Sequence, residues 1–351
     1  MYKSIIRPLL FLCPPEWIHR AVNILLPILC RIPFVSYLFR KRYLIRDSRL
    51  QRTLFGIQFP NPVGIAAGFD KEASVYPALA YFGFGHVETG TVTPLPQKGN
   101  PKPRLFRLQK DQALINRMGF NNHGVEAFAA KLNRKRQGVI IGGNIGKNTL
   151  TPNENAAADY LYCFEKLFDL VDYFVINVSC PNIKGMNALQ DRRALMNILN
   201  TVQENNFSRN NPKPVLLKIS PDLTELQLDD VLSMVEEARL DGIVATNTTS
   251  LRDNLITDPK IIEKTGQGGL SGKPLRKKSL KTIKYLHDKS EGKVPIIGVG
   301  GIMSAEDAWE TLEAGASLVQ VYTGFVYNGP SLGKKINKLI LKKMAAESVQ
   351  W

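Results

Sequence analysis

Asparagine, lysine and cysteine side chains stand directly after several short apolar runs of this chain, where their polar atoms can meet a ligand. An asparagine side chain both donates and accepts hydrogen bonds. A group of asparagines at one place therefore suits a planar ligand with alternating carbonyl and ring N–H groups. The asparagines in question are Asn116, Asn121, Asn144, Asn177, Asn182 and Asn247.

Two lysines and one cysteine could supply charge or chemistry at the same place. Lys218 lies within the apolar run Val215–Ile219, and a buried charge needs a partner or an anionic ligand. It could hold negative charge on a cofactor or form a Schiff base. Lys71 follows another apolar run. Cys180 could accept a proton if its pKa is lowered, although a lone cysteine is more often a buried structural residue.

Glycine-rich segments follow the last two apolar runs. The first contains Gly298, Gly300 and Gly301, and the second is Tyr322-Thr323-Gly324. In barrel proteins this pair of loops often binds phosphate through exposed backbone N–H groups, whereas the alternative is an ordinary tight turn. The four histidines are scattered, so we expect no metal site.

Eight apolar runs rich in valine and isoleucine alternate with helix-like stretches from residue 60 onward. Most lack polar alternation, as expected for strands covered on both faces. The pattern predicts an α/β fold, a (β/α)8 TIM barrel, with a doubly wound sheet as the alternative. The expected strands are 63–67, 86–90, 139–144, 174–178, 215–219, 242–245, 295–299 and 318–322. The clearest helices are 124–136, 155–170, 223–240, 275–288, 305–314 and 332–346.

Catalytic groups of such barrels lie at the carboxyl ends of the strands. The asparagines, lysines and glycines above are therefore expected to meet at one barrel mouth. Two connections, 91–115 and 248–274, are long enough to be functional loops.

The first 46 residues differ from the rest of the chain. They hold eight basic residues and one acid, Glu16, and so carry +7 of the net charge of +15. Their longest uncharged stretch, 21–30, is shorter than the ~20 residues of a spanning helix, so we predict short amphipathic helices. These suit a membrane interface, or they could pack on the protein's own core. We divide the chain into this extension, 1–46, and a barrel, 47–351.

The composition is that of an ordinary globular protein, with 351 residues, 44% hydrophobic and 22% charged, and it excludes a disordered or fibrous chain. The charge of +15 points towards an anionic partner, whether nucleic acid, a membrane surface or an acidic substrate, with plain solubility as the alternative. Four cysteines without C-x-x-C spacing indicate a reducing compartment rather than a disulfide scaffold.

Several motifs occur together along the chain: Ala66-Ala67-Gly68-Phe69-Asp70-Lys71, Gly90-Thr91-Val92-Thr93-Pro94, Asn116-Arg117-Met118-Gly119-Phe120-Asn121-Asn122, Asn144-Ile145-Gly146-Lys147-Asn148, Ala245-Thr246-Asn247-Thr248-Thr249, Gly269-Leu270-Ser271-Gly272 and Gly298-Val299-Gly300-Gly301. With Pro15-Glu16-Trp17 and Tyr322-Thr323-Gly324 they span almost the whole sequence. In this combination the chain resembles the membrane-associated, quinone-dependent class of dihydroorotate dehydrogenases. The resemblance implies one FMN per chain and oxidation of (S)-dihydroorotate to orotate in de novo pyrimidine (UMP) synthesis. It also implies a membrane quinone as the final electron acceptor.

The resemblance assigns residues to each ligand. To FMN it assigns Ala67, Gly68, Thr91, Asn144, Asn177, Lys218, Thr246, Gly272, Gly301, Tyr322 and Thr323. To the substrate it assigns Lys71, Asn116, Arg117, Met118, Gly119, Phe120, Asn177, Asn182, Asn247 and Thr248. To the quinone tunnel it assigns His19, Arg107 and Tyr322, with the N-terminal helices at its lipid-facing end.

One segment departs from the membrane class. Where that class carries Ser-Ser-Pro-Asn-Thr, this chain has Ser179-Cys180-Pro181-Asn182-Ile183. Cys180 occupies the position of the catalytic serine, as cysteine does in the soluble classes, and Ile183 replaces a threonine of the proton relay. We expect Cys180 to be the catalytic base, while the N-terminal extension favours the quinone-dependent class.

Three alternatives remain open from the sequence. They are a soluble-class enzyme that uses fumarate or NAD, a Schiff-base aldolase that uses Lys218, and a basic nucleic-acid-binding module, which lacks a recognition motif. On the resemblance we expect no nucleic-acid partner. We also expect a monomer that binds the anionic surface of a bacterial inner membrane peripherally, at its cytoplasmic face.

Overall fold

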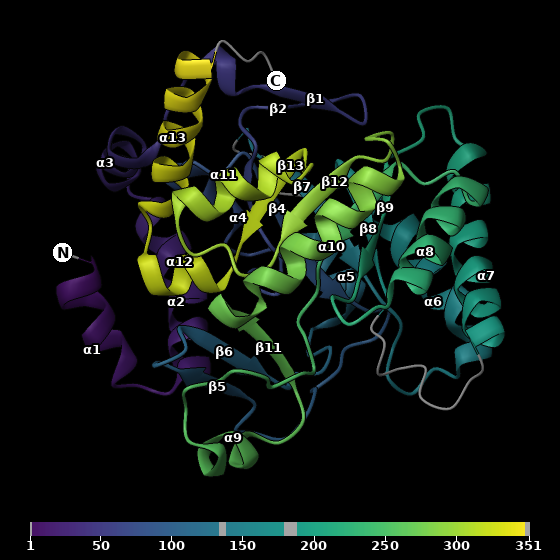
Figure 1. Cartoon of the computed structure of the whole chain (residues 1–351), viewed down its shortest axis with the longest axis horizontal. Coiled ribbons are helices and arrows are strands. Elements are labelled where there is room, and N and C mark those ends of the chain that lie inside the picture. Colours follow the sequence, from purple (N-terminus) through teal and green to yellow (C-terminus); the bar gives the residue numbers. More distant parts are fainter. Residues whose placement is uncertain (1, 133–137, 179–187, 348–351) are drawn as a thin grey trace.

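The computed structural model describes residues 2–132, 138–178 and 188–347, and a closed barrel of eight strands lies at its centre (Figure 1). All neighbouring barrel strands are parallel, in the order β3-β4-β7-β8-β9-β10-β12-β13. Their bounds are β3 Val63–Ile65, β4 His86–Val92, β7 Ile140–Ile145, β8 Tyr173–Asn177, β9 Val215–Ile219, β10 Gly242–Ala245, β12 Ile296–Val299 and β13 Leu318–Val321. The predicted (β/α)8 barrel is confirmed, and each strand begins within one residue of its expected start.

Helices surround the barrel on its outside (Figure 1). They are α4 Tyr76–Leu79, α5 Gly124–Leu132, α6 Ala156–Leu167, α7 Ala188–Phe207, α8 Glu225–Glu237, α10 Arg276–Lys289, α11 Ala305–Glu313, α12 Thr323–Asn328 and α13 Leu332–Glu347. A further helix, α9 Pro259–Thr265, lies in the long connection after β10, away from the barrel (Figure 1). Short 3-10 turns are η2 Ser48–Leu50, η3 Ala80–Phe82, η4 Asn153–Asn155 and η6 Lys273–Leu275. Capping boxes at Thr224 and Ser304 begin α8 and α11, because each side chain accepts a hydrogen bond from the backbone N–H three residues on. The six helices expected from the sequence are present; the end of the first, 133–136, lies outside the described residues.

The two long connections contain strands that the sequence pattern did not indicate. The first forms a hairpin, β5 Leu105–Leu108 and β6 Ala113–Asn116, and the second adds β11 Gly269–Gly272 to it. This small antiparallel sheet has its own apolar core of Leu108, Ala113, Ile115 and Leu270. Strands of four residues are too short to show a clear period, so only their pairing reveals them.

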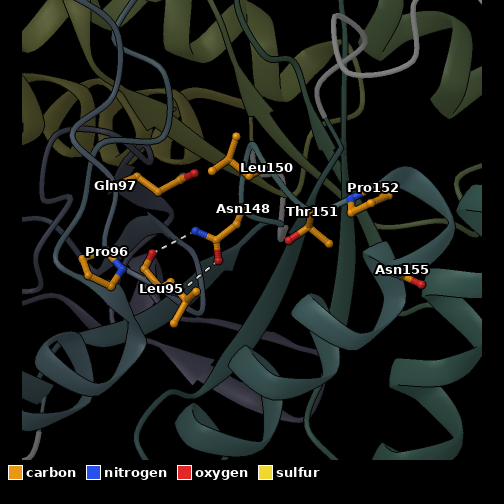
Figure 2. Close-up of a pocket in the computed structure, with 8 residues that line it drawn as sticks. All are labelled: Leu95, Pro96, Gln97, Asn148, Leu150, Thr151, Pro152 and Asn155. Atoms are coloured by element: carbon orange, nitrogen blue, oxygen red, sulfur yellow. Dashed lines mark hydrogen bonds between the residues drawn. The ribbon is translucent and has the colours of Figure 1, made fainter.

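A cavity of about 430 Å³ lies between the loops that follow β4 and β7 (Figure 2). Asn148 closes the two loops on each other, because it donates to Leu95 O at 2.9 Å and accepts from Leu95 N at 3.0 Å. The lining residues are Leu95, Pro96, Gln97, Asn148, Leu150, Thr151, Pro152 and Asn155. None of the residues predicted to bind a ligand lines this cavity, so we do not place the site there.

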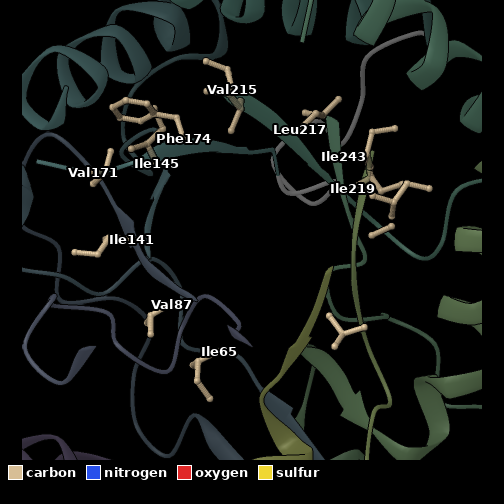
Figure 3. Packing of buried hydrophobic residues seen from close by; sticks show 14 of the residues in the cluster. Ile65, Val87, Ile141, Ile145, Val171, Phe174, Val215, Leu217, Ile219 and Ile243 are labelled. Carbon is tan, nitrogen blue, oxygen red and sulfur yellow. The ribbon is translucent and has the colours of Figure 1, made fainter. Parts of the chain in front are cut away.

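Successive residues of each barrel strand face opposite sides. On β9, Leu217 belongs to the large core between strands and helices, whereas Leu216 belongs to the cluster inside the barrel. Figure 3 shows members of the outer core arranged around the ring of strands. The interior cluster comprises Phe59, Ala66, Tyr173, Val175, Leu216, Val244, Ile297, Val299 and Leu318. Strand alternation therefore turns Lys218, two residues after Leu216, into the barrel.

Three helices precede the barrel, α1 Arg7–Phe11, α2 Pro15–Cys30 and α3 Pro33–Tyr43, after a π-helical turn, η1 Tyr2–Ile6. Cys30 packs with Ala78 and Tyr81 of the barrel domain. Many apolar side chains of these helices remain exposed: Leu9, Leu12, Trp17, Ile24, Leu25, Ile28, Leu29, Ile32, Phe34, Tyr37 and Leu38. The helices thus cover part of the protein's own core and leave a broad apolar surface open.

Within the described residues, no single helix is long and apolar enough to cross a membrane. The pair α2 and α3 reaches that length and composition only when taken together, and the two helices are bent by 105° at their junction.

The hairpin β1 Arg52–Leu54 and β2 Ile57–Phe59 packs against the apolar cluster inside the barrel. Phe59 packs edge-on against His86, with ring centroids 5.5 Å apart. Burial lowers the pKa of His86 to about 3, so its ring is neutral. Gly64 makes room for this ring, since a Cβ at Gly64 would lie 2.2 Å from His86 Nε2.

We expect Gly64→Ala to destabilise the barrel. The added Cβ would overlap the His86 ring, and overpacking of this kind costs about 1–3 kcal/mol. In the double variant Gly64→Ala/His86→Ala the space is free again, so the loss of stability should be smaller than the sum of the two single losses. Urea unfolding measures the four free energies of unfolding, and strict additivity would contradict the contact.

Candidate active site at the barrel mouth

A buried lysine–glutamate pair lies inside the barrel below its mouth. Lys218 belongs to β9 and Glu88 to β4, strands that β7 and β8 separate. Lys218 Nζ lies 2.9 Å from Glu88 Oε1, and the two side chains are 6% and 0% exposed. Asn144 Nδ2 donates to the same oxygen at 2.6 Å. A buried charge is costly unless it is paired and hydrogen-bonded, so these three groups stabilise one another.

The hydrogen bonds continue from Asn144 across the mouth. Thr91 Oγ1 donates to Asn144 Oδ1 and accepts from Asn177 Nδ2, the latter at 2.8 Å. Asn247 Nδ2 donates to Asn177 Oδ1 at 3.2 Å. We call these six side chains the mouth network: Glu88, Thr91, Asn144, Asn177, Lys218 and Asn247. Five barrel strands or their ends contribute to it, and every bond in it runs toward the carboxylate of Glu88.

The sequence pattern did not single out Glu88. It stands inside an apolar strand, as Lys218 does, and a buried acid needs a partner for the same reason as a buried base. Two opposite charges within apolar strands were therefore a signal from which a buried ion pair could have been predicted. That β4 and β9 bring them together across the interior follows only from closure of the barrel.

Lys71 lies at the mouth in the loop after β3. Its Nζ donates to Asn121 Oδ1 at 2.7 Å, across a sequence separation of 50 residues. Burial, with a smaller contribution from the guanidinium of Arg104, lowers the pKa of Lys71 to about 8. Asp70 fixes the loop, because its carboxylate accepts backbone N–H groups at 2.8, 3.0 and 2.7 Å from Ser74, Val75 and Tyr76.

Hydroxyl groups pair at the loops after β10 and β13. Thr246 Oγ1 lies 3.2 Å from Ser279 Oγ, and Thr323 Oγ1 lies 2.8 Å from Ser271 Oγ. Thr246 and Thr323 are both nearly fully buried. Hydroxyls both donate and accept, so these pairs can turn their donors toward an anion.

Glycines with positive φ stand in other segments near the mouth: Gly301 after β12, Gly272 at the end of β11 and Gly68 after β3. Gly301 has a φ of +71°, and a Cβ there would lie 2.4 Å from the Cα of Arg276. At Gly272, with a φ of +98°, a Cβ would lie 2.4 Å from Gln112 O. Gly68, after β3, has a φ of +91° and donates its N–H to Gly90 O at 2.8 Å; Ala67 precedes it. Gly301 and Gly272 are therefore required for space as well as for conformation, because a side chain at either would meet neighbouring backbone.

These features together fit a flat heterocycle that carries a phosphate group. Buried amides and an ammonium group are present at the mouth, and hydroxyls with glycine backbone lie at one side of it. Among the described residues Lys218 donates only to Glu88, so two of its three N–H groups remain for a ligand.

Asn116 and Thr248 flank Gly269 of the small sheet. Asn116 Nδ2 donates to Gly269 O at 3.4 Å, and a Cβ at Gly269 would lie 1.9 Å from Thr248 Oγ1. The backbone N–H of Thr248 donates to Asn247 Oδ1 at 2.8 Å. Both predicted substrate residues therefore border the mouth network from the side of the small sheet.

The segment after Asn116 is only partly directed toward the mouth. Arg117 turns outward, because its Nε and Nη2 donate to Pro103 O at 3.1 and 2.9 Å and its guanidinium lies over the Phe106 ring. Met118 is buried, Gly119 is exposed, and Phe120 is half-buried. The side chain of Arg117 thus takes no part in the mouth network.

Cys180 and Asn182 lie outside the described residues, as does the whole stretch 179–187. Cys13, Cys30 and Cys163 are free thiols. Among the residues that the structure does describe, no three histidine, cysteine or acidic side chains form a metal-binding group.

An aromatic wall connects the N-terminal helices to the mouth. His19 Nε2 lies 2.8 Å from Phe69 O, and the Phe69 ring packs edge-on with both His19 and Tyr322, at 5.6 and 5.7 Å. Burial lowers the pKa of His19 and raises that of Tyr322 to about 12, so both side chains favour their neutral forms. Arg107 lies 4.4 Å from the centre of the Phe11 ring, and both Phe11 and Tyr322 pack against the small cluster that contains Tyr327. Of the predicted tunnel residues, His19 and Tyr322 belong to this wall, and Arg107 contacts Phe11 of α1.

Comparison with protein families places the site in context. The family model described as dihydroorotate dehydrogenase matches residues 49–344. A protein of Christiangramia forsetii named dihydroorotate dehydrogenase (quinone) is 54% identical over 343 residues, which are 98% of this chain and 99% of that protein. One of the same name from Nostoc sp. (strain PCC 7120) is 46% identical over 361 residues, 98% of this chain and 95% of that one.

A solved structure agrees with these relatives. The crystal structure of DHODH from Eimeria tenella in complex with ferulenol superposes with a TM-score of 0.79 at 36% identity. The match covers 91% of this chain and 92% of that chain.

Proposed function

The chain belongs to the quinone-dependent dihydroorotate dehydrogenase family, and on that premise we propose that it oxidises (S)-dihydroorotate to orotate with FMN as hydride acceptor and a membrane quinone as final acceptor. One observation carries the proposal: amide, hydroxyl and ammonium groups from separate strands form a single buried network at the mouth of the barrel. A 54% identical relative named for this activity supports it.

We assign the FMN site to the residues that the resemblance names: Ala67, Gly68, Thr91, Asn144, Asn177, Lys218, Thr246, Gly272, Gly301, Tyr322 and Thr323. When bound, FMN supplies an acceptor for a hydride and passes the two electrons on to quinone. The hydroxyl pairs and glycine backbone suit its phosphate, and Lys218 would carry positive charge beside the N1 side of the ring.

The chain's own residues bind and orient the substrate. Lys71 pairs with the substrate carboxylate, and the amides of Asn177 and Asn247 hold the pyrimidine ring through its carbonyl and N–H groups. Asn116 to Phe120, Asn182 and Thr248 complete the substrate site. Cys180 removes the proton from C5 of the substrate while a hydride leaves C6, so the product is orotate. Quinone takes up the two electrons with two protons.

The N-terminal extension, residues 1–46, provides the membrane contact in this proposal. Its exposed apolar side chains and its charge of +7 suit an anionic lipid surface, at the cytoplasmic face of a bacterial inner membrane. The aromatic wall with His19, Arg107 and Tyr322 then lies between lipid and flavin as the path for quinone. We propose that the protein acts as a monomer.

The purified protein should be yellow, and dihydroorotate oxidation should depend on a quinone. Visible spectra, followed by assays with quinone, fumarate and NAD as separate acceptors, measure both properties. Activity with fumarate or NAD but not with quinone would replace this proposal by a soluble-class enzyme. A colourless protein trapped on a carbonyl substrate by borohydride would favour the aldolase, although Lys218 is ion-paired whereas a Schiff base forms from a neutral amine.

Cys180→Ala should lower the rate of flavin reduction by dihydroorotate about 10²–10⁴-fold, because a proton acceptor is lost. In wild type this rate should level off at a lower pH than in Cys180→Ser, since a thiol has an unperturbed pKa of about 8.5, well below that of an alcohol. Stopped-flow absorbance across pH 5–10 records both profiles. A normal rate in Cys180→Ala would exclude Cys180 as the base.

Orotate should bind more weakly as pH rises above about 8. The pKa of Lys71 is about 8, so its ammonium form, which pairs with the ligand carboxylate, is present below that pH and disappears above it. The dissociation constant should then rise up to tenfold per pH unit. Changes in flavin absorbance on titration with orotate measure this constant. Lys71→Arg should remove the rise, because guanidinium keeps its charge; an unchanged profile would contradict the role of Lys71.

A further inference from the structure

Glu88 is the final acceptor of the mouth network. Its Oε1 accepts hydrogen bonds from Lys218 Nζ and Asn144 Nδ2, and its side chain has no exposed surface. Among the ion pairs of the described residues, this is the one in which both side chains are less than a tenth exposed. A carboxylate can only accept hydrogen bonds. Glu88 therefore fixes which partner donates and which accepts in each hydrogen bond of the network that ends at it.

Among the residues that the structure describes, one cation contacts Glu88. Asn144 from β7 and Tyr173 from β8 are neutral neighbours, and Lys218 from β9 is the cation. Burial raises the pKa of Tyr173 well above its usual range, so its phenol is not an anion here. The buried pair Lys218–Glu88 therefore has no net charge, and changing either member changes the charge below the mouth by one.

Resting on the FMN site proposed above, we propose that Glu88 is a positioning residue that sets the charge which the barrel interior presents to the flavin. Reduction adds negative charge to the N1 side of a flavin, and a neighbouring ammonium favours that state. The carboxylate of Glu88 offsets this effect and holds Lys218 in a fixed place. It thereby keeps bound FMN reducible by dihydroorotate and still able to pass electrons to quinone.

Charge-changing variants of similar shape test this role. Glu88→Gln, Lys218→Met and their double variant are loaded with FMN, and the equilibrium constant for electron exchange with a reference dye is measured spectroscopically at pH 6.5. Glu88→Gln should shift this constant about tenfold toward reduced flavin, and Lys218→Met about tenfold toward oxidised flavin. The double variant lacks both charges and should return to within about threefold of wild type.

Gln320→Met is the matched control. Gln320 is buried in the barrel on β13, on the same side of the strand as Leu318, and belongs to no bond of the mouth network. It should leave the constant within about twofold of wild type, because no charge changes. If Glu88→Gln alone does not fold, the test is the comparison of the double variant with Lys218→Met. The double variant is expected to fold, since replacing both members of a buried pair is better tolerated than breaking it.

The outcomes separate this inference from the proposed function. A wild-type protein that takes up no flavin when supplied with FMN contradicts both. Flavin-loaded wild type with an unshifted constant in Glu88→Gln contradicts the role of Glu88 alone. If Glu88 had a merely structural role, its loss would lower FMN affinity, measured by flavin fluorescence. The electron-exchange constant would then not shift in opposite directions in the two single variants. The constant of the double variant would depart further from wild type than that of either single variant.

Discussion

The ion pair between Lys218 and Glu88 is the interaction on which the site depends. Moving a carboxylate or an ammonium group out of water costs several kcal/mol, and only a close partner with further hydrogen bonds offsets that cost. Glu88 meets this condition through Oε1, which accepts from both Lys218 and Asn144. The remaining amides of the mouth then follow in one chain of donors, so a single buried charge orders groups from five strands.

The barrel allows this arrangement because its two cores are separate. Val, Ile and Leu side chains between strands and helices form a continuous outer core, which holds the strands rigidly in place. The interior needs to be apolar only in part: the interior cluster supplies apolar side chains, while His86, Glu88 and Gln320 introduce buried polar atoms. The ring of His86 fits inside the barrel because Gly64 has no side chain there, and Phe59 at the end of the hairpin packs against that ring.

The N-terminal helices are attached to the site at two points. Glu16 of α2 accepts from Arg104 Nε and Nη2 at 3.1 and 2.8 Å, and Arg104 also donates to the carbonyls of Lys98 and Asn100. His19, one turn further along α2, meets the carbonyl of Phe69, two residues before Lys71. The surface that leaves apolar side chains exposed is thus joined by short contacts to the loops that carry Lys71 and the segment after Asn116.

The sequence by itself determined the eight strands, six of the helices and the burial of Lys218 in an apolar strand, because apolar runs and helical spacing are local properties. It also placed Asn144, Asn177 and Asn247 at strand ends. Only the tertiary structure decided that Glu88 faces Lys218, that Asn121 meets Lys71, that Arg117 turns away and that two long connections form one sheet. These are contacts between residues distant in the chain, and closure of the barrel, not any local pattern, brings them within bonding distance.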